Sequence, residues 1–284
     1  MTLEVSSQPI ATRDIQIEPF TPLHLEGAVH LSQQVSWPHR FEDWALTLSV
    51  SKGVVALCDG VIVGTALCTI FGPVASLNMI IVDAQMRGQG LGRKLMDRII
   101  ALTGDPELRL VATTDGIPLY EKLGFVAAGQ IVQHQGIARK VAPIQPVEKV
   151  TAENLPRLAA LDADASGMER LALLQAIAAL PDGQSEIFVT DAGFAMKRQF
   201  GRGTVIGPVV ADTDTAARSL IAAIANQVQG QFLRIDLPVQ RGLGEFVETL
   251  GLANAGGGTA MVMRAAQHPE THMKTYALIS QALG

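Results

Sequence analysis

Several kinds of residue and segment are scarce in this 284-residue chain, and each scarcity excludes a class of protein. Cys58 and Cys68 are the only cysteines, and a two-residue turn at Asp59-Gly60 would place them several pairs apart on a hairpin. We therefore expect no disulfide, and two free thiols suit a reducing cytoplasm. No apolar run reaches 18 residues and no secretory leader pattern opens the chain, so we expect a cytoplasmic protein that does not enter membranes.

Positive charge is scarce as well. The 22 lysines and arginines are outnumbered by 27 aspartates and glutamates, and no basic run occurs, so we expect no nucleic-acid partner. Asp162 and Asp164 have no histidine or cysteine partner at ligand spacing, so we expect no metal site. Hydrophobic residues, in contrast, make up 48% of the chain, and its length suits two domains with sizeable cores.

The most informative segment is a glycine-rich turn between an apolar strand and an amphipathic helix. It reads Arg87-Gly88-Gln89-Gly90-Leu91-Gly92. Glycines let the backbone turn sharply and leave its N–H groups uncovered. The free N–H groups and the dipole at the start of the following helix add to this positive potential. Strand, bare amides and helix start together predict a cradle for a pyrophosphate.

This glycine pattern differs from two common phosphate-binding motifs. Its third glycine has the wrong spacing for the Rossmann fingerprint, and no Gly-Lys-Ser/Thr tripeptide of a P-loop occurs. Arg87, Gly90 and Gly92 instead resemble, position for position, the Arg/Gln-x-x-Gly-x-Gly/Ala acyl-CoA loop of the GNAT acetyltransferase superfamily. The alternative is a purely structural turn before a helix.

A second motif follows in the next strand and helix, where the chain reads Tyr120-Glu121-Lys122-Leu123-Gly124-Phe125. Pro118 suits the first turn of this short helix, and Gly124 suits the left-handed cap that ends it. The hexapeptide resembles the second GNAT motif, whose tyrosine hydroxyl reaches the thioester sulfur. The resemblance implies that Tyr120 is the general acid that protonates or hydrogen-bonds the departing thiolate. The alternative is a tyrosine half-buried between helix and sheet.

An internal repeat organises the whole chain. Residues 17–25 align with residues 147–155, and in each a short strand leads to a threonine that suits a helix N-cap. Leu123-Gly124-Phe125 is echoed in the same order by Leu250-Gly251-Leu252. The repeat predicts two copies of one fold, with the proline-containing segment 140–146 as the linker.

We therefore expect a catalytic domain over residues 1–142 and a second domain over residues 147–284. In the first we expect strands at 13–18, 53–59, 61–71, 74–82, 108–113 and 125–141, and helices at 21–35, 40–50, 90–102 and 117–123. In the second we expect strands at 185–191, 193–200, 203–211, 231–236 and up to about residue 265, and helices at 154–164, 168–180, 213–229, 241–249 and 269–283.

The two copies differ where the chemistry would need them to agree. In place of the glycine-rich turn the second copy has Asp212-Thr213-Asp214-Thr215-Ala216-Ala217, whose carboxylates would repel a pyrophosphate. Tyr120 aligns with Val247, which has no proton to donate. We interpret the second copy as a degenerate GNAT-like domain that kept the fold without a cofactor site.

The resemblance also implies how the first copy would bind acetyl-CoA as co-substrate. In GNAT proteins the fourth and fifth strands separate, and a backbone N–H of the fourth strand, here that of Ile81 or Val82, faces the acetyl carbonyl. The fourth strand carries no carboxylate that could act as a base, so Asn78 either holds a water in that role or simply satisfies a bulged strand. The expected cofactor-binding residues are Ile81, Val82, Arg87, Gly88, Gln89, Gly90, Leu91, Gly92 and Arg93.

Both tryptophans of the chain fall in the segment Trp37-Pro38-His39-Arg40-Phe41-Glu42-Asp43-Trp44, which in this fold lines the acceptor groove. The tryptophans could stack on an amine, and His39 or Asp43 could take its proton, so the expected acceptor residues are Trp37, His39, Glu42, Asp43 and Trp44. The alternative is a helix N-cap with two anchoring aromatics. The segment, together with the Tyr120 motif, resembles a subgroup of tandem GNAT proteins.

Two segments of the second copy leave further alternatives open. Residues 162–170 read as a solvated turn between helices, unless Asp164 or Arg170 reaches the substrate of the first copy. Gly201-Arg202-Gly203 reads most simply as a hairpin turn.

These observations predict an α+β fold, a mixed sheet with helices, in which two tandem GNAT-like domains form a pseudo-dimer. We expect an N-acetyltransferase that moves an acetyl group from acetyl-CoA to a primary amine of a small molecule by direct attack. The alternatives are a non-catalytic CoA-binding sensor or scaffold, and an acyltransferase with a longer acyl donor or a protein amine as acceptor. The chain would act as a monomer with its internal pseudo-dimer or as a homodimer.

Overall fold

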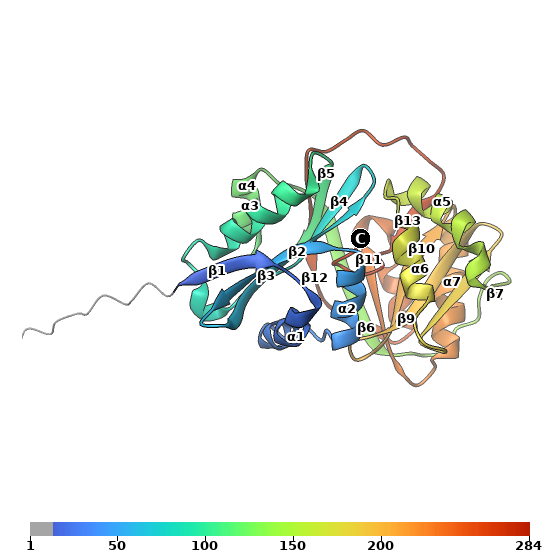
Figure 1. The fold of residues 1–284 in the computed structure, drawn as a ribbon. Helices are drawn as coiled ribbons and strands as arrows, with labels where there is room; N and C mark the ends of the chain where they lie inside the picture. The colour runs from blue at the N-terminus through green and yellow to red at the C-terminus, as the bar shows by residue number, and fades with distance from the viewer. Residues whose placement is uncertain (1–13) are drawn as a thin grey trace, which may run out of the picture.

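The computed structural model describes residues 14–284, in which thirteen strands join into one continuous sheet (Figure 1). Its main path runs β1-β2-β3-β4-β5-β12-β6-β11-β10-β9-β8-β7, and β13 pairs with β10. Most neighbours are antiparallel, whereas β4 with β5 and β10 with β11 are parallel, so the sheet is mixed as the sequence predicts. The strands are β1 (Ile15–Pro19), β2 (Lys52–Cys58), β3 (Val61–Phe71), β4 (Val74–Val82), β5 (Glu107–Ala112), β6 (Val126–Ile137), β7 (Glu148–Val150), β8 (Ser185–Thr190), β9 (Gly193–Phe200), β10 (Gly203–Ala211), β11 (Phe232–Pro238), β12 (Leu252–Met263) and β13 (Lys274–Ala277).

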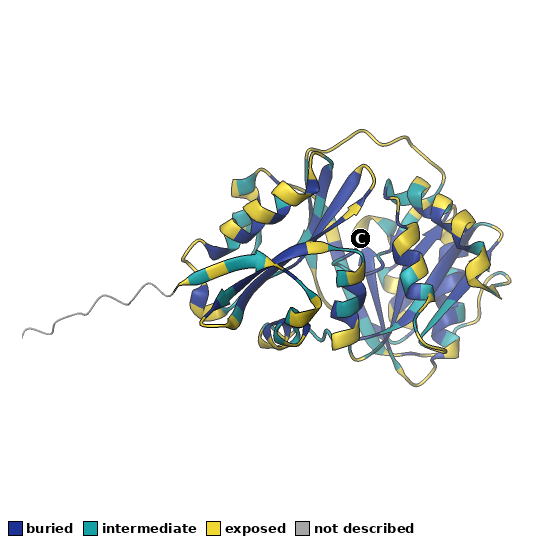
Figure 2. Ribbon diagram, in the orientation of Figure 1, coloured by how far each residue is buried: buried dark blue, intermediate teal, exposed yellow. Residues whose placement is uncertain are grey.

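Helices cover the sheet on both faces, and Figure 2 shows buried strands beneath helices whose outer sides are exposed. On β2, Val54 and Ala56 pack with Leu95 of one helix layer, whereas Val55 packs with Leu31 of the other. Burial on both faces explains why these strands read as nearly continuous apolar runs. No helix in residues 14–284 is long and apolar enough to cross a membrane. The helices are α1 (Leu25–Gln34), α2 (Phe41–Ser49), α3 (Leu91–Thr103), α4 (Ile117–Leu123), α5 (Leu155–Ser166), α6 (Leu171–Ala178), α7 (Asp214–Gln227) and α8 (Gly244–Thr249).

The two copies repeat the same order of elements, but they exchange their last long strands. β6 of the first copy pairs with β11 of the second, from Ile131↔Pro238 to Ile137↔Phe232. β12 of the second copy pairs with β5 of the first, for example Thr259↔Ala112, and also with β6. The exchange makes one sheet of the two copies and brings the second copy against the gap between β4 and β5. The sequence predicts these strands but not which copy each one completes.

The helix predicted over residues 269–283 is wrong. The chain forms β13 there, which pairs antiparallel with β10 from Val209↔Ala277 to Ala211↔Lys274. β10 and β11 are paired only as far as Ile206↔Ile235, so the next backbone groups of β10 would otherwise lack partners. Satisfying those groups outweighs the helical pattern of the segment. The C-terminus then lies between the two copies, as Figure 1 shows.

Candidate active site

The site is built around the separation of β4 and β5. The two strands pair only from Val74↔Glu107 to Ser76↔Arg109. Within residues 14–284, β4 continues to Val82 without a partner on the β5 side. Separation of paired strands leaves backbone N–H and C=O groups free along the open edge. Such an opening at the carboxyl ends of parallel strands is where open α/β sheets bind ligands.

A β-bulge marks the start of the open part of β4. The register between β3 and β4 shifts there, and Met79 has a φ of +50° although it is not glycine. The Thr65 hydroxyl donates a 2.8 Å hydrogen bond to the Met79 carbonyl, which holds the strained residue in place. A left-handed residue with a side chain costs of order 1–3 kcal/mol, and such strain clusters at functional sites.

The directions of the backbone N–H groups after the bulge distinguish Ile81 from Val82, the two residues whose amide could bind the acetyl carbonyl. Asp83 donates its N–H to the Val63 carbonyl at 2.9 Å, toward β3. Because N–H directions alternate along a strand, the N–H of Ile81 also points toward β3 and that of Val82 points into the gap. Val82 therefore has the free amide of the pair.

A cavity of about 370 Å³ extends from this gap to the junction of the two copies. The first copy lines it with residues 77–80 of β4, Tyr120 of α4 and residues 36–39 before α2. The exchanged strands β6 and β12 contribute further lining. The second copy closes the cavity with the β9–β10 turn, β11 and the C-terminal segment 280–282. The site is thus assembled from both copies.

The glycine-rich loop lies at the end of β4, directly before α3. Gly88 and Gly90 have φ angles of +76° and +78°, which favour glycine, and a Cβ added to either would meet no atom within 4 Å. Gly90 is the N-cap of α3, so the amides of the first helical turn have no side-chain partner. This open cradle of bare amides fits a pyrophosphate. Gln89 and Arg93 are exposed beside it, and Arg87 forms an exposed 3.6 Å ion pair with Asp115.

Tyr120 combines a buried ring with a hydroxyl at the cavity. The residue is 7% exposed, and its ring packs edge-on against Phe125. Burial raises the pKa of Tyr120 to about 12, so the hydroxyl stays protonated at neutral pH. In the described residues 14–284 the hydroxyl has no hydrogen-bond partner. It is therefore free to donate to a group bound in the cavity.

Asn78 and His39 both line the cavity, and each has one buried hydrogen-bonding atom without a partner in residues 14–284. The Asn78 amide nitrogen donates to Thr69 Oγ1 at 3.0 Å, whereas its Oδ1 is buried with no partner among the described residues. His39 Nδ1 is likewise buried and unpaired within residues 14–284. Burial, partly offset by Asp43, lowers the pKa of His39 to about 4, so its ring is neutral at pH 7. An unpaired buried polar group costs about 1–3 kcal/mol, which a bound ligand would recover.

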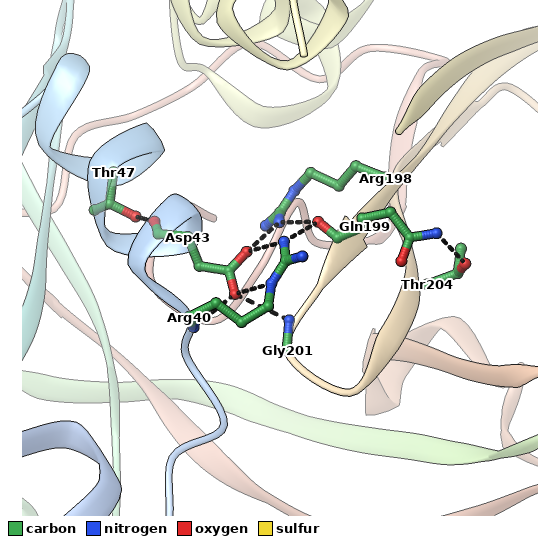
Figure 3. A network of polar contacts seen from close by, with 7 residues as sticks. All are labelled: Arg40, Asp43, Thr47, Arg198, Gln199, Gly201 and Thr204. Carbon is green, nitrogen blue, oxygen red and sulfur yellow. Dashed lines mark hydrogen bonds and ion pairs between the residues drawn. The ribbon is translucent and has the colours of Figure 1, made fainter. Parts of the chain in front are cut away.

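Asp43 joins the two copies instead of lining the cavity (Figure 3). The carboxylate accepts hydrogen bonds from Arg40, including its backbone N–H at 2.9 Å, and from the Gly201 N–H of the second copy at 2.9 Å. Arg198 lies 3.8 Å away. Burial alone would raise the pKa of Asp43, but the hydrogen bonds from Arg40 and Gly201 hold it below its usual value. A carboxylate so engaged is a poor base for an amine.

The other expected acceptor residues of the segment 37–44 also fall into two groups, those that line the cavity and those that do not. Trp37 lines the cavity with His39. Trp44 is fully buried in the core, where its ring stacks on Phe20 at 5.8 Å. Glu42 is exposed on α2 and lies outside the cavity. The helix-capping alternative thus describes Asp43 and Trp44, and the acceptor interpretation is retained for Trp37 and His39.

The alternative that Asp164 or Arg170 reaches the substrate of the first copy is not supported. Arg170 is 1% exposed and holds the Asp162 carboxylate in a bidentate pair, with its nearest contact at 2.6 Å. Neither Asp164 nor Arg170 lines the cavity beside Tyr120. The segment is the expected turn between α5 and α6, with Asp164 and Glu169 exposed, but Asp162 and Arg170 form a buried ion pair within it.

The second copy's contribution to the cavity was not predicted from the sequence. Gly201-Arg202-Gly203 is the expected hairpin turn, but it also places Arg202 in the cavity wall. Phe200 and Arg234 of the second copy line the same wall, and Gln133 and Gln135 come from the exchanged β6. No motif in the sequence marks these residues, because the strand exchange alone brings them together.

No group of three or more histidine, cysteine, aspartate or glutamate side chains arranged to hold a metal occurs in residues 14–284. The free thiols of Cys58 and Cys68 are both buried.

Comparisons with known proteins give a consistent result. Residues 50–127 and residues 158–277 each match an acetyltransferase (GNAT) domain family, and the two matches together span more than half of the chain. The chain is 29% identical to the "Uncharacterized N-acetyltransferase YitH" of Bacillus subtilis, over 92% of this chain and 95% of that protein.

Solved structures share the fold at lower identity. A putative acetyltransferase from Pyrococcus horikoshii superposes with a TM-score of 0.82 and 20% identity, over 95% of this chain and 96% of that one. A tandem GNAT protein from the clavulanic acid biosynthesis pathway superposes with a TM-score of 0.63 and 13% identity, over 91% of this chain and all of that one. The chain therefore belongs to the GNAT acetyltransferases and carries two GNAT domains in tandem.

Proposed function

We propose that the first copy transfers an acetyl group from acetyl-CoA to a primary amine of a small molecule by direct attack. The observation that carries the proposal is the cavity that places Tyr120 beside the open edge of β4. In this scheme the loop from Arg87 to Gly92 holds the pyrophosphate and the Val82 N–H binds the acetyl carbonyl. The amine nitrogen forms a C–N bond with the carbonyl carbon as the C–S bond breaks.

The cavity favours the amine in its neutral, nucleophilic form. Among residues 14–284 no aspartate or glutamate lines it, so no carboxylate in this wall stabilises a charged ammonium group. Asn78 Oδ1 is an unpaired acceptor that can orient an amine N–H, directly or through a water. His39 is too weak a base to deprotonate an alkylamine, because its pKa of about 4 lies far below the amine value of about 10. We assign His39 to positioning the acceptor.

The pKa of Tyr120 bears on how it would assist the leaving thiolate. Complete proton transfer from a phenol with a pKa of about 12 to a thiolate of pKa about 8.5 is uphill by about 5 kcal/mol. Tyr120 therefore acts mainly by donating a hydrogen bond to the thiolate as charge develops. The attacking amine loses a proton as the C–N bond forms, and this proton ends on the thiolate to give the CoA thiol.

A screen of primary amines with acetyl-CoA, followed by release of the CoA thiol and mass analysis of the product, tests the proposal. The expected result is amine-dependent thiol release with one acetyl group added to the amine. Tight acetyl-CoA binding without turnover on any amine would instead indicate a sensor or scaffold. Faster turnover with longer acyl donors, or with peptide amines, would correct the donor or the acceptor.

A further inference from the structure

The charge of the acceptor cavity is one-sided. Within residues 14–284 its ionisable lining residues are His39, Tyr120, Arg202 and Arg234, with no carboxylate among them. His39 is neutral at pH 7 because burial lowers its pKa to about 4. An amine alone would therefore find two cationic side chains in this wall and, among residues 14–284, no carboxylate to offset them. The acceptor needs a second group that these arginines can bind.

Arg202 is the free cation of this wall. The residue is exposed on the β9–β10 turn, and in residues 14–284 its guanidinium has no hydrogen bond or ion pair. The turn itself is fixed to the first copy, because Gly201 donates its N–H to the Asp43 carboxylate (Figure 3). The two copies also approach closely there, since a Cβ at Gly201 would lie 3.0 Å from the Pro38 carbonyl. A free guanidinium held on an anchored turn suits recognition of an anion.

Arg234 is held in place by Asp236 and by the ring of Phe200. Its guanidinium is paired with both carboxylate oxygens of buried Asp236 and lies 5.2 Å from the centre of the Phe200 ring. Arg198 contacts the same ring at 4.7 Å. The Gln281 amide also donates to Asp236 at 3.1 Å, so the C-terminal segment helps to fix the pair.

The charge around the Phe200 ring and the turn is positive. Four arginines, Arg40, Arg198, Arg202 and Arg234, gather there against two carboxylates, those of Asp43 and Asp236. Asp43 and Asp236 are both buried, so they cannot turn to a ligand. The excess of positive charge is directed toward the cavity through Arg202 and Arg234, since these two line it.

Resting on the proposed function, we infer that the acceptor is an amine that also carries a carboxylate. Arg202 binds this carboxylate, and Arg234 adds positive charge to the same wall of the cavity. The first copy supplies the groups that face the reaction, Tyr120 and Asn78, and the second copy supplies the groups that select the acceptor. An amino acid-like molecule satisfies both halves. Alkylamines and polyamines, which lack an anion, are poor acceptors in this scheme.

Matched pairs of acceptors test the inference. The kcat/KM for ω-amino carboxylates of increasing chain length is compared with that for n-alkylamines of the same length, at saturating acetyl-CoA. The carboxylate should raise kcat/KM at least tenfold at one chain length, and Arg202→Gln should abolish this preference mainly through KM. Arg157→Gln removes the same charge from an exposed site on α5 and should leave the preference intact.

Equal kcat/KM with and without the carboxylate, or a preference that survives Arg202→Gln, would overturn the inference. The donor is tested as the other source of a carboxylate, with succinyl-CoA against acetyl-CoA and an n-alkylamine as acceptor. If Arg202 proved to be needed only for succinyl-CoA, the anion would belong to the donor and the acceptor assignment would be wrong.

Binding separates this inference from the proposed function. Calorimetric titration of the CoA complex with an N-acetylated ω-amino carboxylate requires no turnover. Binding that weakens at least tenfold in Arg202→Gln would support the anion subsite even if no amine were acetylated, which would overturn the proposed function alone. Binding that is unchanged in Arg202→Gln would overturn the subsite whether or not the enzyme turns over.

Discussion

Strands β4 and β10 hold equivalent places in the two copies, but the gap beside each is filled differently. Beyond Ser76 the edge of β4 opens into the cavity that contains Tyr120. Beyond Ile206 the edge of β10 is covered by β13, and the chain continues there with a 3.0 Å hydrogen bond from Leu278 N–H to the Asp236 carbonyl of β11. A Cβ at Gly207 would lie only 1.9 Å from the Leu278 carbonyl, so the segment fits closely. The second copy fills its cleft with its own chain.

The helix starts after these strands differ in the same sense. α3 begins at Gly90, which has no side chain to occupy the free amides. α7 begins at Thr213, whose hydroxyl accepts the Ala216 N–H at 3.3 Å. Val247 occupies the place of Tyr120 and is completely buried. We therefore propose that one fold serves as a cofactor cleft in the first copy and as a wall of the acceptor cavity in the second.

The largest effect is expected where the copies are joined. Asp43→Ala leaves Arg40 and Arg198 without their carboxylate and should lower the free energy of unfolding by about 3–5 kcal/mol, measured by urea denaturation. Asp97→Ala, which breaks an exposed 3.7 Å pair with Arg93, should cost under about 1 kcal/mol. Equal losses in the two variants would show that Asp43 does not hold the copies together.

Removing one hydroxyl tests which copy is catalytic. Tyr120→Phe should lower turnover by roughly ten- to a thousandfold while leaving acetyl-CoA affinity intact, because only the donor to the thiolate is lost. Tyr276, the other tyrosine of the chain, lies in β13 of the second copy, and Tyr276→Phe should leave turnover unchanged. Steady-state kinetics would refute the role of Tyr120 if both variants turned over like the parent.

Strain at the glycine-rich loop tests which copy binds the cofactor. We expect calorimetry to give one acetyl-CoA per chain, and Gly90→Val to weaken it by about 2 kcal/mol, or roughly thirtyfold. Gly242→Val is the matched control, because Gly242 has a similar left-handed backbone (φ +66°, ψ +23°) and equally open space but lies in the second copy. A second site of similar affinity would show that the second copy also binds acetyl-CoA. Tight binding that survives Gly90→Val would show that the loop of the first copy is not the binding site.

The smallest effect concerns the pH dependence of stability. His39 has a folded-state pKa of about 4, below its unfolded value of about 6.5, so the unfolded chain binds more protons between these values. Stability should therefore fall as the pH drops from 6.5 to 4, by about 2–3 kcal/mol from this residue although the effect is absent at pH 7, and His39→Gln should flatten the slope. An unchanged slope in His39→Gln would mean that the ring is not buried as a neutral group.

Local sequence patterns were sufficient to predict the elements whose conformation depends on the residues within them. Gly90 and Gly124 have the positive φ angles that a turn and a helix cap require, and both helices begin or end there as expected. The C-terminal segment was mispredicted because its partner is the open edge of β10, formed some 70 residues earlier in the chain. Pairing over such a distance leaves no periodic signal within the segment itself.

For the acceptor cavity, too, the sequence predicted the segment involved, whereas the tertiary structure decided which of its residues line the cavity. Sequence singled out the segment 37–44 by composition, but burial decided that Trp37 and His39 face the cavity while Asp43 and Trp44 face the protein. Arg202 read as part of a turn, and nothing near it in the sequence indicates that the turn contacts Asp43 of the other copy.

By itself, the sequence determined the repeat, the glycine-rich loop, the position of Tyr120 and the loss of both in the second copy, because each depends on neighbouring residues and their backbone preferences. The tertiary structure alone decided that β6 and β12 exchange places, that β13 fills the second cleft and that Arg202 and Arg234 reach the first. These features depend on which backbone edges remain unpaired after the local elements form, and only the assembled sheet satisfies them.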